Sequence, residues 1–510
     1  MKNVIYDLES WEEQVDALNR QISRRRLLQL MGYSAAGIVS AGVLAACGGT
    51  NPPEPVNITV TPIGTVNGSV GPVREITPYF LGYNNVPIHS PSWDNSDVVT
   101  AAIQMKPGTL RYPGGTVANY WDWRTGWFLP QALGSFLSAP RSTYRLQELK
   151  IAVNATGAIP IYVLNMLTSD LNTQLEMLRT AKSMGLPVQL VELGNEFYLA
   201  NPDDYVRKFP TGVEYGKMAT TWIQAIRAEF PSLKIAAVGG VPASDSSSDP
   251  RKANWTSDVL QNLQGADALT WHPYVSILKG TITSDVSLDV GGQLDTITSS
   301  RWQQFENTAQ SLPTNMKLWI TEYNFVDPSK QVFYRWIDGI FAAEMTLNFL
   351  AEARTELVCF YDMIGKTGNE VIFYNQQGGG NSTLAPFALT AAGWSMRLLC
   401  DTIYAMTSAQ PLSFSAASVQ GSNTSFPSLQ GWIFSDGKRR QAFLINSGSD
   451  SFTWTVDTTF AQGSTFKQLA GDPLTTVTGS NSLTAQSGTL GNKLLLPAYS
   501  VTQLKQSASS

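Results

Sequence analysis

The sequence predicts an α/β fold, a (β/α)8 TIM barrel with an accessory β-sandwich, from two observations. Between about residues 76 and 402, short apolar runs alternate with segments whose apolar residues recur every three or four positions, the pattern of strands followed by helices. After about residue 403 that helical period is lost, and short apolar runs are separated by Ser, Gly, Asn and Asp, as in an all-β module. Eight strand–helix units within roughly 320 residues fit a closed barrel.

The eight runs have the composition of buried parallel strands. We expect them to begin near residues 79, 108, 159, 187, 234, 268, 318 and 357, in YFLGYN, GTLRYPGG, IPIYVLN, PVQLVELGNE, KIAAVGG, ALTWHPY, LWITEYN and LVCFYDM. Segments between them, such as LNTQLEMLRTAKSMG and VEYGKMATTWIQAIRAEF, have amphipathic helical spacing. The first run is not followed by a G-x-G-x-x-G turn, which disfavours a doubly wound nucleotide-binding sheet.

The flanking segments complete the expected organisation. Residues 403–510 are predicted to form the sandwich, and residues 57–75, which hold most of the run VNITVTP, are predicted to add a strand to it. Residues 48–56 are rich in Pro and Gly, which is typical of a tether.

Residues 1–47 have the pattern of an export signal. Arg24 and Arg25, in SRRRLLQLM, precede the apolar stretch GYSAAGIVSAGVLAAC, which is too short and too rich in small residues for a stable membrane span. The pair of arginines resembles a twin-arginine signal, and LAAC resembles a bacterial lipoprotein box. The resemblance implies export by the twin-arginine pathway and lipidation of Cys47, which would anchor the mature protein to a membrane at the cell envelope. A signal cleaved after a small residue, without a lipid, is the alternative.

The composition excludes several function classes. Only 15% of residues are charged and the net charge is −5, so no nucleic-acid surface is expected. With two histidines, His89 and His272, and three cysteines, we predict no metal site and no cofactor. Cys359 and Cys400 lie in apolar segments. Because twin-arginine substrates fold before export, we expect buried free thiols there rather than a disulfide.

Two glutamates are predicted at the C-terminal ends of barrel strands, where barrel chemistry gathers. Glu196 ends the fourth strand in VELGNE, and Glu322 ends the seventh in LWITEYN, so both can face the barrel mouth from opposite sides. Retaining cleavage of a glycosidic bond needs a proton donor and a nucleophile about 5–5.5 Å apart. We predict Glu196 as the acid/base and Glu322 as the nucleophile, with Glu192 as a buried supporting acid. A structural salt-bridge network is the alternative.

Neighbouring residues are assigned supporting roles. Arg111, at the end of the second strand, is expected to keep Glu322 ionised, while Glu196 is expected to stay protonated once the nucleophile is negative and the sugar excludes water. Asn195 is expected to donate to the sugar hydroxyl next to the anomeric carbon. Tyr274, on the sixth strand, is expected to hydrogen-bond the nucleophile.

The remaining candidates each have two readings. His272 either contacts substrate or completes a buried polar network. Trp121 and Trp123 alternate in the loop after the second strand, where they either stack on sugar faces or pack the loop onto the barrel. Further candidate sugar ligands lie at the ends of the first and eighth strands: Asn84, Tyr361 and Asp362.

These motifs resemble clan A glycoside hydrolases, whose signature is an acid/base glutamate after strand four, preceded by Asn, and a nucleophile glutamate after strand seven. VELGNE, DALTWHPY and LPAYSVTQL resemble family 79, the β-glucuronidase and heparanase-like enzymes. LRYPGGTVANYWDW is similar to the corresponding segment of family 51 arabinofuranosidases. The resemblance implies a retaining glycoside hydrolase that acts on a poly- or oligosaccharide, with a β-glucuronidase-type activity as one expectation.

Other functions remain open at this point. Within the clan, an α-L-arabinofuranosidase, a β-xylosidase or a β-glucosidase fits the same residues. A non-catalytic surface glycan-binding protein would use the Trp-rich loops and leave the carboxylates idle. An exported cofactor-dependent oxidoreductase is suggested by the export signal alone. A short distance between the carboxyl groups of Glu196 and Glu322 would favour the hydrolase over the glycan-binding protein.

Overall fold

The computed structural model describes residues 61–139, 141–240, 249–282, 290–368, 370–375, 384–414, 418–420, 425–456, 460 and 463–506. The predicted signal, Cys47 and the tether lie outside these residues. Among the helices described, none is long and apolar enough to cross a membrane.

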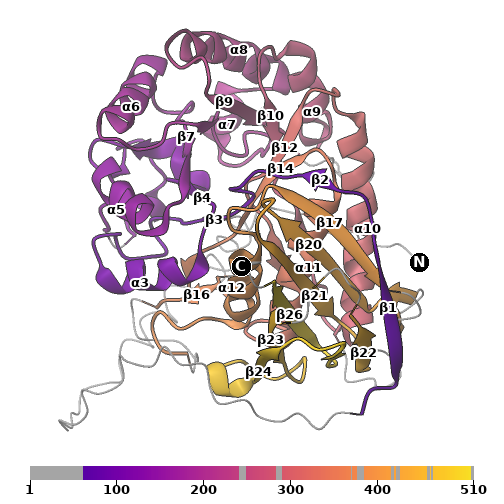
Figure 1. Ribbon diagram of the computed structural model, residues 1–510. Coiled ribbons are helices and arrows are strands. Elements are labelled where there is room, and N and C mark those ends of the chain that lie inside the picture. Colours follow the sequence, from indigo (N-terminus) through magenta and orange to yellow (C-terminus); the bar gives the residue numbers. More distant parts are fainter. Residues whose placement is uncertain are drawn as a thin grey trace, which may run out of the picture. The chain divides into compact units, whose positions relative to one another are not determined.

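Eight parallel strands close into a barrel, which confirms the predicted fold (Figure 1). The sheet closes in the order β10-β12-β14-β3-β4-β7-β8-β9, so each strand pairs with its neighbours along the chain. Every strand overlaps the run that predicted it: β3 (Leu81–Asn84), β4 (Thr109–Tyr112), β7 (Ile159–Val163), β8 (Leu190–Glu192), β9 (Lys234–Val238), β10 (Ala268–Thr270), β12 (Lys317–Ile320) and β14 (Thr355–Phe360).

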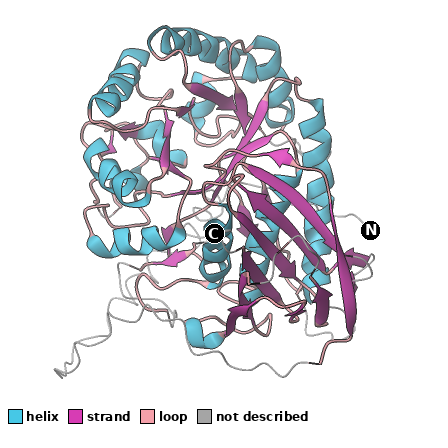
Figure 2. Cartoon of the chain, in the orientation of Figure 1, coloured by secondary structure: helices cyan, strands magenta, loops and turns pink. Residues whose placement is uncertain are grey.

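Helices cover the outside of the barrel strands (Figures 1 and 2). Their ends carry the expected signals. Thr211 and Glu214 form a capping box at the start of α8, and Gly157 ends α5 in the left-handed conformation. The helices are α3 (Ser96–Met105), α4 (Gly134–Leu137), α5 (Leu146–Thr156), α6 (Leu171–Ser183), α7 (Asp203–Lys208), α8 (Gly212–Glu229), α9 (Pro250–Asn262), α10 (Val290–Ser311), α11 (Trp336–Ala351) and α12 (Ala391–Ile403), with a 3-10 turn at Thr116–Tyr120.

Apolar side chains fill the barrel, as the continuous apolar runs predict for strands buried on both faces. Trp319, Leu357 and Cys359 pack there with Ile161 and Leu190, all fully buried. Both Cys359 and Cys400 are buried free thiols, as expected. Short paired strands extend the loops above the barrel: β5 (Trp121–Asp122) with β6 (Trp127–Phe128), β11 (Tyr274–Ser276) with β13 (Asn324–Val326), and β15 (Ile364–Gly365) with β16 (Ile372–Phe373).

The C-terminal region forms a ten-stranded, mostly antiparallel sheet in the order β24-β23-β26-β21-β20-β17-β1-β22-β25, with β2 paired to β17. It encloses its own core, in which Trp454, Leu444 and Leu504 are buried. The strands are β1 (Gly64–Val70), β2 (Arg74–Glu75), β17 (Ser408–Phe414), β20 (Leu429–Ser435), β21 (Arg440–Asn446), β22 (Phe452–Thr455), β23 (Thr465–Ala470), β24 (Thr484–Thr489), β25 (Lys493–Leu496) and β26 (Ser500–Lys505), with a separate hairpin β18 (Ser418–Gln420) and β19 (Ser425–Pro427) and a 3-10 turn at Ser480–Ser482.

An N-terminal strand joins this sheet, but it lies after the apolar run VNITVTP on which the prediction was based. Strand β1 pairs parallel with β22 and antiparallel with β17. It begins at Gly64, after VNITVTP has ended, and most of that run lies outside the described residues. The strand GTVNGSV contains two glycines and has little apolar periodicity, so the pairing depends on the neighbouring strands rather than on local propensity.

Backbone groups at the start of α11 connect the barrel to the sheet. The first amides of a helix have no partner within the helix, and here those of Trp336 and Ile337 donate to the carbonyls of Thr475 and Pro473 at 3.0 and 2.9 Å. The Trp336 indole donates to the Tyr499 carbonyl at 2.6 Å. The helix that follows strand β13 is therefore fixed at its N-terminus by the C-terminal region.

Candidate active site

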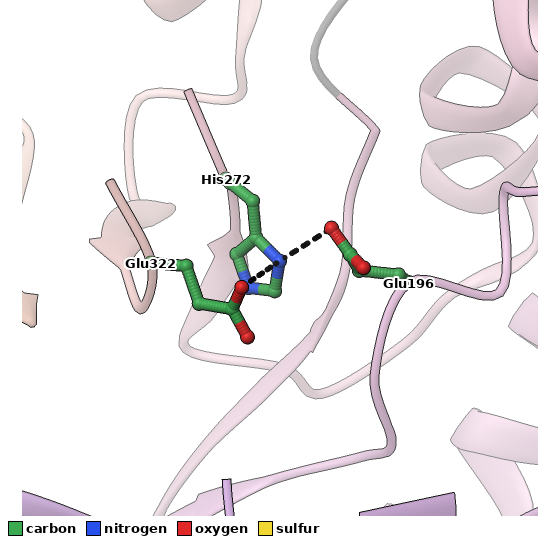
Figure 3. Close-up of side chains that lie close together, drawn as sticks. All are labelled: Glu196, His272 and Glu322. Carbon is green, nitrogen blue, oxygen red and sulfur yellow. Dashed lines mark hydrogen bonds and ion pairs between the residues drawn. The ribbon is translucent and has the colours of Figure 1, made fainter. Parts of the chain in front are cut away.

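Side chains from β4, from the segment after β8, from β10–β11 and from the end of β12 meet at the C-terminal end of the barrel. Figure 3 shows Glu196 and Glu322 on either side of the His272 ring. The side chains of all three are at most 8% exposed. The structure thus brings together the two glutamates that the sequence placed on strands four and seven.

The turn after β8 aims Glu196 into the site. Gly194 has φ of 92°, and a Cβ at this position would lie 2.1 Å from a ring carbon of Phe197, so only glycine fits. Glu196 itself has φ of 50°, a left-handed conformation that a non-glycine residue adopts at a cost. Asn119 fixes the backbone of Asn195, the residue between Gly194 and Glu196. Its Nδ2 donates to the Asn195 carbonyl at 2.8 Å, and its Oδ1 accepts from the Asn195 amide at 3.1 Å.

Arg111 is fully buried and binds three groups at once. Its Nε and Nη2 donate to the two carboxylate oxygens of Glu192 at 2.7 and 2.8 Å. Its Nη1 donates to Glu322 Oε1 at 2.5 Å, and Nη2 also donates to Asn195 Oδ1 at 2.7 Å. Burial lowers the pKa of Arg111, but the charges of Glu192 and Glu322 outweigh this and raise it above its ordinary value. The guanidinium is thus a permanent charge in the site.

Each glutamate has a distinct set of partners. Glu322 Oε2 accepts from the Tyr274 hydroxyl at 2.8 Å, as the sequence predicted, in addition to the bond from Arg111. Glu196 Oε1 accepts from the Tyr198 hydroxyl at 2.8 Å and lies 2.9 Å from His272 Nδ1. Burial raises the pKa of both tyrosines well above the ordinary value, so both remain hydrogen-bond donors at neutral pH.

The pKa directions differ from the sequence expectation that Glu196 is protonated and Glu322 ionised. Burial raises the pKa of Glu196, but the hydrogen bond and charge of His272 outweigh it, and the net direction is downward. Burial also raises the pKa of Glu322, and here it prevails over the opposing charges of His272 and Arg111. The expected protonation states followed from the charge of Arg111 and left out His272, whose hydrogen bond and charge lower the pKa of Glu196 most.

Glu196 and His272 form a close pair, with Nδ1 2.9 Å from Oε1. Burial lowers the pKa of His272, but the carboxylates of Glu322 and Glu196 raise it above its ordinary value overall. The lowered pKa of Glu196 and the raised pKa of His272 both favour an ion pair between Oε1 and Nδ1. His272 completes a buried polar network, one of its two predicted readings.

Glu196, His272 and Glu322 also have the residue types of metal ligands, and their candidate ligand atoms lie within 4.8 Å of one another. The guanidinium of Arg111 lies directly against Glu322. A divalent cation here would be placed beside a fixed positive charge. The arrangement fits two carboxylates that are hydrogen-bonded to protein side chains better than it fits a metal centre.

The predicted aromatic residues pack the loop after β4. Trp121 is 3% exposed and lies edge-on to Trp127 and Phe128. The Trp123 indole donates to the Thr173 carbonyl at 3.2 Å, against α6. These contacts favour the packing reading for both tryptophans.

Two predicted amides are fully buried at the strand ends and each has one group without a partner among the described residues. Asn84 donates to the Thr321 carbonyl at 2.9 Å, and its Oδ1 has no hydrogen bond. Asn195 accepts from Arg111 through Oδ1, which leaves its Nδ2 without an acceptor. Because a buried polar atom without a partner is costly, both groups are suited to a ligand.

Sequence reasoning missed two residues and one pair. Tyr198 is two residues after Glu196 and Thr321 directly precedes Glu322, so proximity was a signal for both, but their hydroxyl directions depend on tertiary contacts. His89 Nδ1 lies 2.8 Å from Asp362 Oδ2, across the ends of the first and eighth strands. No motif in the sequence connects these two residues.

Comparisons with known proteins give the fold. No family model and no curated protein matches the chain. Among solved structures, the α-L-arabinofuranosidase of Thermotoga maritima is 18% identical with a TM-score of 0.63, over 86% of this chain and 98% of that one. A family 51 α-L-arabinofuranosidase of Bifidobacterium longum is 14% identical with a TM-score of 0.66, over 88% and 99%. A 4-O-α-L-rhamnosyl-β-D-glucuronidase of Fusarium oxysporum is 13% identical with a TM-score of 0.56, over 86% and 99%. The barrel with its accessory sheet is thus an architecture found in glycoside hydrolase structures.

Replacement of Gly194 by Ala should be more destabilising than an ordinary glycine replacement at positive φ. The left-handed backbone costs about 1–2 kcal/mol for an alanine, and the Phe197 ring blocks the methyl group, which adds about 1–3 kcal/mol. Gly185→Ala is the matched control, because Gly185 has φ of 79° and nothing within 4 Å of an added Cβ. Thermal or urea unfolding of both variants measures the difference. Equal losses of stability would show that the Phe197 contact does not constrain the turn.

Proposed function

We propose that the protein is a retaining glycoside hydrolase, in which Glu322 is the nucleophile and Glu196 the acid/base. The observation that carries the proposal is the position of the two carboxylates, which lie on either side of His272 with oxygens within 4.8 Å. Inverting enzymes need room for a water between carboxyl groups about 6.5–9.5 Å apart, whereas about 5–5.5 Å serves a covalent intermediate. The short separation also favours hydrolysis over a glycan-binding protein with idle carboxylates.

In the first step, Glu322 attacks the anomeric carbon while the bond from that carbon to the leaving oxygen breaks. The leaving oxygen takes the proton that Glu196 shares with His272, so the aglycone departs as an alcohol. Arg111 and Tyr274 hold the Glu322 carboxylate in position for attack. In the second step, Glu196 removes a proton from water, the water oxygen displaces Glu322, and the anomeric configuration is retained.

Asn195 is suited to bind the sugar hydroxyl next to the anomeric carbon. Its Oδ1 is fixed by Arg111, and its Nδ2 has no acceptor among the described residues. A hydroxyl oxygen beside the reacting centre would satisfy this donor, and such contacts strengthen as charge develops in the transition state.

We propose a neutral pentose, an α-L-arabinofuranoside, as the first substrate class. Two of the neighbours named above are α-L-arabinofuranosidases, and the one from Bifidobacterium longum is of family 51. A uronic acid would need an unengaged cation for its carboxylate. The two cations that contact the glutamates, Arg111 and His272, are both already bound to carboxylates. The segments 241–248, 283–289, 369 and 376–383, which the structure does not describe, contain no Lys, Arg or His.

A screen of aryl glycosides tests the proposed activity. We expect turnover of 4-nitrophenyl α-L-arabinofuranoside, little or none of the β-glucuronide, and retained anomeric configuration of the first product by proton NMR. The β-xyloside and β-glucoside complete the panel. Turnover of the β-glucuronide alone, in the manner of the activity named for the Fusarium protein, would replace the substrate assignment, and hydrolysis with inversion would contradict the mechanism.

Azide separates the roles of the two glutamates. Glu322→Ala should lower kcat by at least about a thousandfold, and azide should restore turnover by forming a glycosyl azide of inverted configuration. Glu196→Ala is the matched control. It should lose less activity on substrates with good leaving groups and give an azide product of retained configuration. The same product from both variants would contradict the assignment.

We further propose that the protein is exported by the twin-arginine pathway and anchored through a lipid on Cys47. The support is the sequence pattern of residues 23–47. Cys47→Ala should release the protein from the membrane fraction and abolish incorporation of labelled fatty acid. Cys359→Ala changes a buried thiol and should leave both unaltered. A Cys47→Ala protein that stays lipid-labelled would overturn this proposal.

A further inference from the structure

A continuous chain of side-chain hydrogen bonds connects Glu192 to Glu196 through two groups outside the double-displacement step. Thr321 Oγ1 lies 3.2 Å from Glu192 Oε1 and 2.9 Å from His272 Nε2. The other ring nitrogen of His272, Nδ1, lies 2.9 Å from Glu196 Oε1. All four side chains are buried.

The chemistry of the donors orients this chain in one direction. Glu192 is paired through both oxygens with Arg111, so its carboxylate accepts hydrogen bonds and donates none. The single hydroxyl proton of Thr321 therefore points to Glu192, and its oxygen is left to accept from the other neighbour. That neighbour is His272 Nε2, which must then carry a proton.

With a proton fixed on Nε2, the state of Nδ1 determines what Glu196 can do. A neutral His272 has a lone pair on Nδ1 and accepts a hydrogen bond from a protonated Glu196. A charged His272 has the proton on Nδ1 and donates to an ionised Glu196. In both states one transferable proton lies between Nδ1 and Oε1. If Nε2 were bare instead, neutral His272 would carry its only proton on Nδ1, and Glu196 would be ionised with no proton to give.

We infer that Thr321, oriented by Glu192, is a positioning residue that fixes His272 in the form with a proton on Nε2 and thereby enables Glu196 to act as an acid. This inference rests on the proposed function for its catalytic consequence, and on geometry alone for the protonation of His272. The charged and titratable groups that face the pair are Arg111, Glu192 and Glu322, together with the hydroxyls of Tyr198 and Tyr274.

Replacement of Thr321 by Val keeps the shape of the side chain and removes the acceptor for Nε2–H. The protonated form of the Glu196–His272 pair is then less stable, so the pair loses its proton at lower pH. In the pH profile of kcat/KM, the alkaline limb should move to lower pH by about one unit, the shift expected for one hydrogen bond of ordinary strength. The loss of rate should be larger for a glycoside with a poor leaving group, which needs the acid more.

Two further variants make this result specific. Thr321→Ser keeps the hydroxyl and should retain the wild-type pH profile. Thr355→Val removes a buried hydroxyl that has no partner among the described residues. Thr355 is the first residue of β14, whereas Thr321 follows the last residue of β12, so the two lie at opposite ends of the parallel strands. This variant should not move the alkaline limb. A Thr321→Val enzyme that unfolds at the wild-type temperature and keeps the wild-type alkaline limb would overturn the inference.

The protonation of His272 can also be read directly in the unmutated chain. The protein has two histidines, so nitrogen-15 labelled histidine gives two ring systems, and His89→Gln assigns them. We expect a protonated Nε2 on His272 across the pH range of activity, and a bare Nε2 there would overturn the inference. Because this measurement needs no substrate, it distinguishes a failed inference from a failed proposal of glycoside hydrolysis.

Discussion

The buried guanidinium of Arg111 is the constraint on which the rest of the site depends. A charge removed from water is tolerated only if carboxylates and other acceptors surround it. Here those acceptors come from two other parts of the barrel, Glu192 and Asn195 at the end of strand four and Glu322 at the end of strand seven. To satisfy Arg111, the fold must bring the segment before Glu196 and the nucleophile candidate to the same place.

The same constraint limits what else the site can bind. Two carboxylates already neutralise Arg111, and His272 is engaged by Glu196, so no unengaged positive charge among these residues is left for an anionic sugar or a second anion. The backbone is also held tightly, because Asn119 clamps the Asn195 peptide from both sides and Gly194 is packed against Phe197. These contacts agree with the proposal of a neutral, hydroxyl-rich substrate.

The sequence predicted the parts of this structure that depend on buried apolar runs and on strand order. All eight barrel strands were found, because strands covered on both faces leave continuous apolar segments, and the positions of Glu196 and Glu322 at strand ends followed from them. An N-terminal strand of the sheet was predicted within residues 57–75, but the residues of β1, Gly64–Val70, were not singled out because they have no clear period. The sequence left two roles open for His272 and assigned none to Thr321, because the direction of a hydrogen bond is set by neighbours that are distant in sequence.

The partners of the two glutamates differ in one respect that suits a two-step reaction. Glu322 is bound to a guanidinium, which keeps its proton at any working pH and so can stabilise a carboxylate but cannot transfer a proton to it. Glu196 is bound to an imidazole, which titrates near neutrality and can give or take a proton. The proposed mechanism uses both differences: Glu322 stays a carboxylate as the nucleophile, whereas Glu196 loses its proton in the first step and regains one in the second. With Arg111 in place, burial still leaves the pKa of Glu322 raised while His272 leaves that of Glu196 lowered, so the guanidinium limits the rise at Glu322 without reversing the order of the two groups.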